Sequence, residues 1–86
     1  MFIISGGKGT GKTKTLLEMA KTGNGVVVCA DPEAIRDRAY RYGIVGLEII
    51  SYAEAYLTGK PVYIHDINKF IEYNMPETVC YTLSND

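Results

Sequence analysis

Eight consecutive residues near the amino terminus have the types and spacing needed to grip a phosphate group. The segment Gly6-Gly7-Lys8-Gly9-Thr10-Gly11-Lys12-Thr13 matches the pattern G-x-x-x-x-G-K-[ST] at every fixed position. Glycines allow positive φ, so the backbone can turn its N–H groups toward phosphate oxygens, and a following helix would add its N-terminal dipole. Lys12 is expected to reach the β- and γ-phosphates, and the Thr13 hydroxyl is expected to ligate Mg²⁺. The segment therefore predicts a site for a nucleoside triphosphate and its magnesium ion.

The two other lysines around this loop have two interpretations. Lys8 and Lys14 are either additional phosphate contacts or solvated charges on the surface. We include both in the predicted nucleotide site, which then comprises Gly6, Gly7, Lys8, Gly9, Thr10, Gly11, Lys12, Thr13 and Lys14.

The elements that must position this loop alternate along the chain. Apolar runs predict strands over 2–4, 25–30, 47–50, 62–66 and 78–83. Amphipathic stretches predict helices over 11–22 and 67–73 and within 31–43 and 51–59. Asp31-Pro32-Glu33 supplies an N-cap, a first-turn proline and a first-turn acid, and Ser51 with Glu54 fits a capping box. Alternating strands and helices indicate an α/β fold with a mainly parallel sheet.

On these residues the chain resembles the P-loop NTPases. The resemblance is to the branch in which a strand with a polar sensor residue lies between the P-loop strand and the strand bearing the metal-side acid. The order of glycine loop, strand ending in Asp31-Pro32 and late acidic strand is also similar to small P-loop ATPases encoded by bacterial viruses. The resemblance implies one three-layer domain over residues 1–86, with a mainly parallel five-stranded sheet flanked by helices. It also implies ATP, or another nucleoside triphosphate, and Mg²⁺ as cofactors.

The acidic strand fits the resembled pattern less well than the loop does. Hydrolases of this branch use one acid at a strand end to hold Mg²⁺ and a second carboxylate beside it to polarise water. If Asp66 is on the metal side, the adjacent catalytic position is Ile67, which cannot orient water. If Asp66 is the catalytic carboxylate, the metal side is His65, although Mg²⁺ prefers oxygen ligands.

We expect the first alignment, with Thr13 and Asp66 near the metal, and keep the second as the alternative. The candidate catalytic residues are Lys12, Asp66 and His65, the last being either a hydrogen-bonded scaffold residue or a proton acceptor. Since one expected carboxylate is missing under both alignments, the sequence supports nucleotide binding better than rapid hydrolysis.

The sequence lacks the features that are typical of several other function classes. Asn68-Lys69-Phe70-Ile71 begins like the guanine-binding N-K-x-D segment but lacks its aspartate, so ATP or relaxed base specificity is expected. The chain has no long lid that would cover an acceptor, which counts against a phosphotransferase. We therefore expect Mg²⁺-dependent nucleotide binding with slow or partner-stimulated hydrolysis. The alternatives are a nucleotide-dependent binding module with little hydrolysis and, with less support, a small-molecule phosphotransferase.

Composition limits the partners and the compartment. The 86 residues carry a formal net charge of −1, so no bulk positive charge indicates nucleic-acid binding, and any such contact would have to be a local patch. Cys29 and Cys80 lie in apolar runs and are expected to be buried, reduced thiols. No apolar run approaches the length of a membrane span, so a cytoplasmic location without membrane contact is expected, in the host cytoplasm if the chain is viral.

The expected sheet suggests self-association or a protein partner. If the strand over 78–83 inserts between the strands over 2–4 and 62–66, the strand over 2–4 lies at an uncovered apolar edge. Such edges favour pairing with another chain, so we expect a homo-oligomer or a partner protein.

Overall fold

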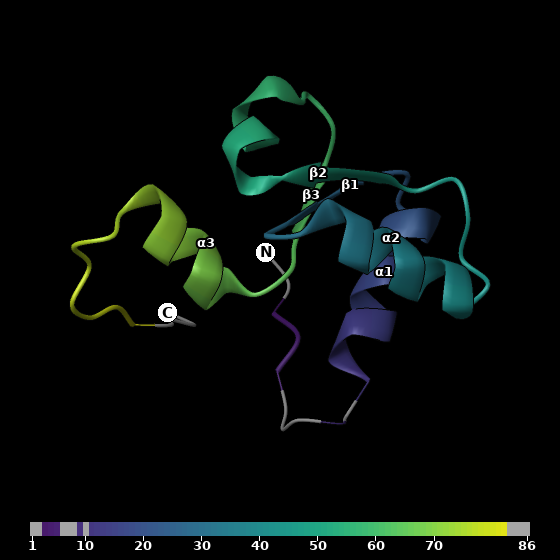
Figure 1. Ribbon diagram of the computed structural model, residues 1–86, viewed down its shortest axis with the longest axis horizontal. Coiled ribbons are helices and arrows are strands. Elements are labelled where there is room, and N and C mark those ends of the chain that lie inside the picture. The colour runs from purple at the N-terminus through teal and green to yellow at the C-terminus, as the bar shows by residue number, and fades with distance from the viewer. Residues whose placement is uncertain (1–2, 6–8, 10, 83–86) are drawn as a thin grey trace.

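In a computed structural model of the protein, which describes residues 3–5, 9 and 11–82, three short parallel strands form a sheet with helices on both faces (Figure 1). The strand order is β2-β1-β3. The strands are β1 (Val26–Cys29), β2 (Glu48–Ser51) and β3 (Val62–Ile64). The helices are α1 (Lys12–Thr22), α2 (Pro32–Arg41), the 3₁₀ helix η1 (Tyr52–Leu57) and α3 (Ile67–Asn74).

The central strand β1 is the most buried element of the fold. Its four residues, Val-Val-Val-Cys, have no solvent exposure. Such a run, apolar on both faces and rich in β-branched residues, suits a parallel strand covered on both sides. Val27 is in register with Ile49 of β2 and with Tyr63 of β3, so β1 holds the two outer strands together.

Helices α1 and α2 cover one face of the sheet. Leu17 and Ala20 of α1 and Ile35 and Ala39 of α2 pack with Val27 and other inward side chains of this face. The spacing of three and four residues within each pair places both members on one stripe of their helix. These contacts fix α1 against the sheet.

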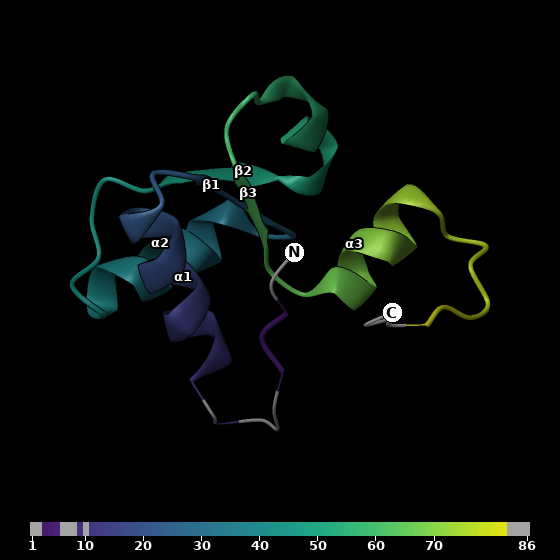
Figure 2. The ribbon, with the colours of Figure 1, turned by 180° about the vertical axis from the view of Figure 1, so that it is seen from behind.

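The opposite face packs against η1 and, through Phe70, against α3. In Figures 1 and 2, η1 lies across the sheet from α1 and α2, and α3 lies to one side of the sheet. Tyr52 of η1 is 3% exposed and packs with Val26 and Val28. Phe70 of α3 meets the Tyr52 ring edge-on, with 5.3 Å between ring centroids. The chain thus leaves β1 toward α2 on one face and leaves β3 toward α3 on the other.

The predicted five-stranded sheet is wrong, because the part of the chain that the structure describes contains only three strands. Of the strand predicted over 2–4, Ile3 and Ile4 are described and pair with no neighbour, while Phe2 lies outside the described residues. The idea that this P-loop strand forms a sheet edge is therefore not supported. A short apolar run becomes a strand only where a neighbouring strand offers hydrogen bonds, and this run has none in the described structure.

The strand predicted over 78–83 is also absent across its described residues, 78–82. After α3 the Thr78 backbone N–H and hydroxyl both donate to the Met75 carbonyl, at 3.0 and 2.8 Å. The chain then runs out beyond α3, away from the sheet (Figures 1 and 2). Val79 is 98% exposed, and Cys80 is exposed too, so the prediction of a buried thiol is wrong for Cys80 and confirmed for Cys29.

Other local predictions are confirmed. Asp31 caps α2 by accepting a hydrogen bond from the Ala34 backbone N–H at 3.2 Å. Glu54 accepts from the backbone N–H and the hydroxyl of Ser51, at 3.3 and 3.0 Å, although the helix that follows is 3₁₀ rather than α. Among the described residues, no helix is both long enough and apolar enough to cross a bilayer.

Candidate functional site

The described part of the glycine loop adopts the backbone conformation that its sequence predicts. Gly9 and Gly11 have φ of 83° and 76°, in the left-handed region that favours glycine. Gly11 is the N-cap of α1, and its carbonyl accepts from the Thr15 backbone N–H at 3.0 Å and from the Thr15 hydroxyl at 3.1 Å. Gly6, Gly7, Lys8 and Thr10 lie outside the described residues.

The amino end of α1 has no side-chain cap and no acidic residue in its first turn. The first N–H groups of a helix have no partner within the helix, and they carry the positive end of its dipole. An anion is the ligand that such an end accepts. Within the described residues of α1, Lys12, Thr13 and Lys14 offer no carboxylate at this end.

Packing places this helix end at the carboxyl edge of the sheet. The Thr13 hydroxyl lies 3.2 Å from Nε2 of His65, the residue that follows β3, and both residues are half-buried. The His65 backbone N–H donates to the Val28 carbonyl of β1 at 2.8 Å, which fixes the start of this turn. Connections leave β1 and β3 toward opposite faces here, and ligands in open α/β sheets bind at such places. The structure thus brings together Thr13 and His65, which are 52 residues apart.

Burial controls the charge of His65. It lowers the pKa of the imidazole below its ordinary value of 6.5, because the charged form is poorly solvated there. The nearby Asp66 carboxylate opposes this effect, whereas the positive charges of Arg38 and Lys69 add to it. The ring is therefore neutral near pH 7, with one nitrogen available as an acceptor or as a metal ligand.

Asp66 has a structural role in the described contacts. Its Oδ1 accepts from the Lys69 backbone N–H at 3.2 Å, so the carboxylate caps α3. Asp66 has φ of 63°, one of two positive values among the described residues that are not glycine. Thr13 is hydrogen-bonded to His65, the residue that the alternative alignment placed on the metal side.

Tyr52 supports the same turn and was not among the predicted site residues. Its hydroxyl donates to the His65 carbonyl at 2.7 Å and lies 3.2 Å from the Asp66 carbonyl. Burial raises the Tyr52 pKa to about 12, with smaller contributions from the charges of Asp66 and Cys29, so the hydroxyl remains a donor. The only sequence signal for this role was a tyrosine directly after the Ser51 cap.

The remaining predicted lysines differ in their surroundings. Lys12 is half-buried at the start of α1, beside Thr13. Lys14 is exposed, and its Nζ lies 5.8 Å from the centroid of the Tyr42 ring at the end of α2. The structure thus places the Lys14 ammonium against α2, where a cation–π contact contributes about 0.5–1 kcal/mol at an exposed site.

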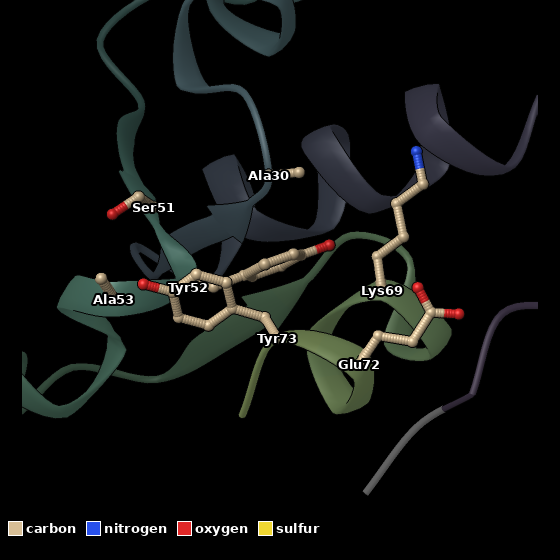
Figure 3. A pocket seen from close by; sticks show the side chains of 7 residues that line it. All are labelled: Ala30, Ser51, Tyr52, Ala53, Lys69, Glu72 and Tyr73. Carbon is tan, nitrogen blue, oxygen red and sulfur yellow. The ribbon is translucent and has the colours of Figure 1, made fainter. Parts of the chain in front are cut away.

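A separate cavity of about 430 Å³ lies beyond the ends of β1 and β2 (Figure 3). Figure 3 shows the Tyr52 and Tyr73 rings close together at its base, with Lys69 and Glu72 extending from α3. The lining consists of Ala30, Ser51, Tyr52, Ala53, Lys69, Glu72 and Tyr73, so it includes no residue of the glycine loop.

The donors near α1 bear on which metal could bind there. No group of three or more His, Cys, Asp or Glu side chains suited to a metal occurs within residues 3–5, 9 and 11–82. The pair at hand is one hydroxyl oxygen, from Thr13, and one imidazole nitrogen, from His65. This pair is a poor match for Mg²⁺, whose preferred donors are all oxygens.

Comparison with known proteins gives no further guidance, since no family model, curated protein or solved structure matches the chain significantly.

Proposed function

We propose that this protein binds a nucleoside triphosphate, with ATP preferred, at the amino end of α1, and that it hydrolyses the nucleotide slowly or not at all when alone. The sheet has three strands rather than five, so the proposal is based on the loop and its surroundings and not on the overall fold. The glycine loop matches the phosphate-binding pattern at every fixed position, and its two described glycines have positive φ.

The observation that carries the proposal is the open amino end of α1 beside the half-buried Thr13 and His65. Backbone N–H groups at this end would hold phosphate oxygens, and Lys12 would add a positive charge at the β- and γ-phosphates. Thr13 would supply a hydroxyl to the accompanying divalent cation, and Nε2 of the neutral His65 ring lies 3.2 Å from that hydroxyl.

The expectation of slow hydrolysis comes from the groups around Asp66. A fast hydrolase needs a free carboxylate or an equivalent acceptor next to the attacking water. Here Oδ1 of Asp66 caps α3, and the adjacent position, where a second carboxylate would polarise the water, is occupied by Ile67. This arrangement also favours the second candidate function, a binding module in which the nucleotide orders the protein for a partner and hydrolysis is incidental.

The test of binding is the substitution Lys12→Ala, compared with Lys21→Ala. Lys21 lies in the last turn of the same helix, so both variants lose one positive charge from α1. We expect Lys12→Ala to weaken ATP binding by at least about 100-fold, roughly 2.7 kcal/mol, and Lys21→Ala to bind as the native protein does. Equal binding by the native protein and Lys12→Ala in calorimetry would overturn the proposal.

Hydrolysis is tested separately with Asp66→Asn, because asparagine is an equally good N-cap and leaves α3 intact. If Asp66 is catalytic, phosphate release falls to the level of Lys12→Ala while ATP binding persists. If native phosphate release already equals that of Lys12→Ala, alone and with DNA added, the binding-module function is the correct one.

A further inference from the structure

We infer that the divalent cation accompanying the nucleotide is held by Nε2 of His65 together with Oγ1 of Thr13, so the site prefers a late first-row ion such as Zn²⁺ over Mg²⁺. This inference rests on the proposed function, since the remaining ligands would be phosphate oxygens and water. It differs from the sequence expectation, which placed Thr13 and Asp66 around Mg²⁺.

The separation of the two donor atoms suits a shared ion. Thr13 Oγ1 and His65 Nε2 are 3.2 Å apart. With metal–ligand bonds of about 2.1 Å, neighbouring ligands are about 3.0 Å apart in an octahedron and about 3.4 Å apart in a tetrahedron. The observed separation lies between these values, so small side-chain shifts are enough for both atoms to ligate one ion.

The backbone of His65 is held in position by two hydrogen bonds. The His65 backbone N–H donates to the Val28 carbonyl at 2.8 Å, and the His65 carbonyl accepts from the Tyr52 hydroxyl at 2.7 Å. Tyr52 is itself 3% exposed, so this support belongs to the core. A ligand residue whose backbone is fixed by the surrounding structure loses little conformational freedom when the metal binds.

Donor chemistry decides which ion is preferred. Imidazole nitrogen suits Zn²⁺ and its late first-row neighbours, whereas Mg²⁺ takes oxygen ligands and gives up water reluctantly. In the nearest carboxylate in sequence, that of Asp66, Oδ1 accepts from the Lys69 backbone N–H as the cap of α3. Exchanging an oxygen donor for His65 nitrogen therefore shifts the preference away from Mg²⁺.

The experiment uses the full chain with Cys80→Ser, which removes the exposed thiol that could bind Zn²⁺ elsewhere. Calorimetry measures binding of a non-hydrolysable β,γ-imido analogue of ATP at saturating Zn²⁺ or saturating Mg²⁺. We expect the Zn²⁺ complex to bind at least about tenfold more tightly than the Mg²⁺ complex. In the matched variant His65→Asp, which restores an oxygen donor, the Mg²⁺ complex should bind at least as tightly as the Zn²⁺ complex.

A second measurement does not depend on any variant of His65. It is the only histidine in the chain, so the ¹⁵N resonance of a ring nitrogen is assigned without ambiguity. We expect the Nε2 resonance to move to a metal-bound position with the Zn²⁺ complex of the analogue and to move little with the Mg²⁺ complex.

The outcomes separate this inference from the proposed function. If the Mg²⁺ complex binds as tightly as the Zn²⁺ complex and the Nε2 resonance stays in place with both, the inference is wrong while nucleotide binding stands. If neither complex binds, the proposed function is wrong and the inference fails with it.

Discussion

The amino ends of α1 and α2 both carry the positive end of a helix dipole, but they differ in the side chains that surround it. At α2, Asp31 accepts from the Ala34 backbone N–H, Pro32 starts the helix and Glu33 adds an acid to the first turn. At α1, the N-cap is Gly11 in the left-handed conformation, with no side-chain cap and no acid in the first turn. Among the described residues, the chain supplies carboxylates at the amino end of α2 and none at the amino end of α1, where we propose that an external anion binds.

The other helices strengthen this contrast. Glu54 accepts hydrogen bonds at the start of η1, and Asp66 caps α3. Helix α1 is the exception among the four helices of the described chain. Since each carboxylate near a helix start stabilises that helix by about 0.3–1 kcal/mol, the lack of one at α1 is a local cost that a phosphate could offset.

The first prediction concerns β1, the buried strand that leads into the closed end of α2. Burial raises the Cys29 pKa from 9.0 to about 11, the main effect on this thiol. Between these values the unfolded chain loses the proton and the folded chain keeps it, so stability is full below pH 9 and falls as pH rises. From this group we expect the free energy of unfolding to fall most steeply near pH 10, by at most about 1.4 kcal/mol per pH unit, and by about 2 kcal/mol in all between pH 9 and 11.

The control for this prediction is Cys29→Ala, because lysines and tyrosines titrate in the same range. Urea denaturation at each pH should give a shallower slope for the variant than for the native protein. Parallel slopes would mean that the buried thiol does not contribute to the loss of stability.

The second prediction concerns a carboxylate added to the amino end of α1. The substitution Lys14→Glu places a carboxylate in the first turn of α1, as Glu33 does in α2. It should weaken ATP binding about tenfold, roughly 1.4 kcal/mol, because the new charge repels phosphate and competes for the helix N–H groups. Calorimetry should show a smaller loss of ATP affinity for Lys14→Gln, which removes the charge without adding a carboxylate. Equal ATP affinities for the native protein and Lys14→Glu would contradict the proposal that the amino end of α1 binds phosphate.

The third prediction concerns the removal of the side-chain cap from the amino end of α2. Asp31→Ala removes the N-cap of α2 and should lower the free energy of unfolding by about 1 kcal/mol. ATP affinity of the folded variant should not change, because Asp31 is not among the residues proposed to hold the nucleotide. Denaturation and calorimetry on the same sample check both points, and a matching drop in affinity would show that the two helix ends are not independent.

The sequence predicted well those features that local chemistry determines. The Asp31 cap, the Ser51–Glu54 pair and the buried β1 run depend on neighbours in the chain, and all three occur in the structure. The five-stranded sheet was wrong because strands at 2–4 and 78–83 require distant partners, which a short apolar run cannot specify.

In the candidate site, too, local features were predictable from the sequence and long-range contacts were not. The loop pattern predicted the positive φ of Gly9 and Gly11, because this conformation depends on glycine itself. The contact between Thr13 and His65 depends on how α1 packs against β3, and alternation along a short strand could not tell His65 from Asp66. The support from Tyr52 arises from the packing of η1 over the sheet, which the sequence pattern does not encode.

The central claim, that the open end of α1 receives the phosphates, is tested most directly by the backbone amide resonances during a titration with ATP and a divalent cation. The account predicts the largest shifts at Gly11, Lys12, Thr13 and Lys14, and little change at Glu33 and Ala34 of α2. Shifts that are larger at α2, or absent at the start of α1 when binding is saturated, would contradict it.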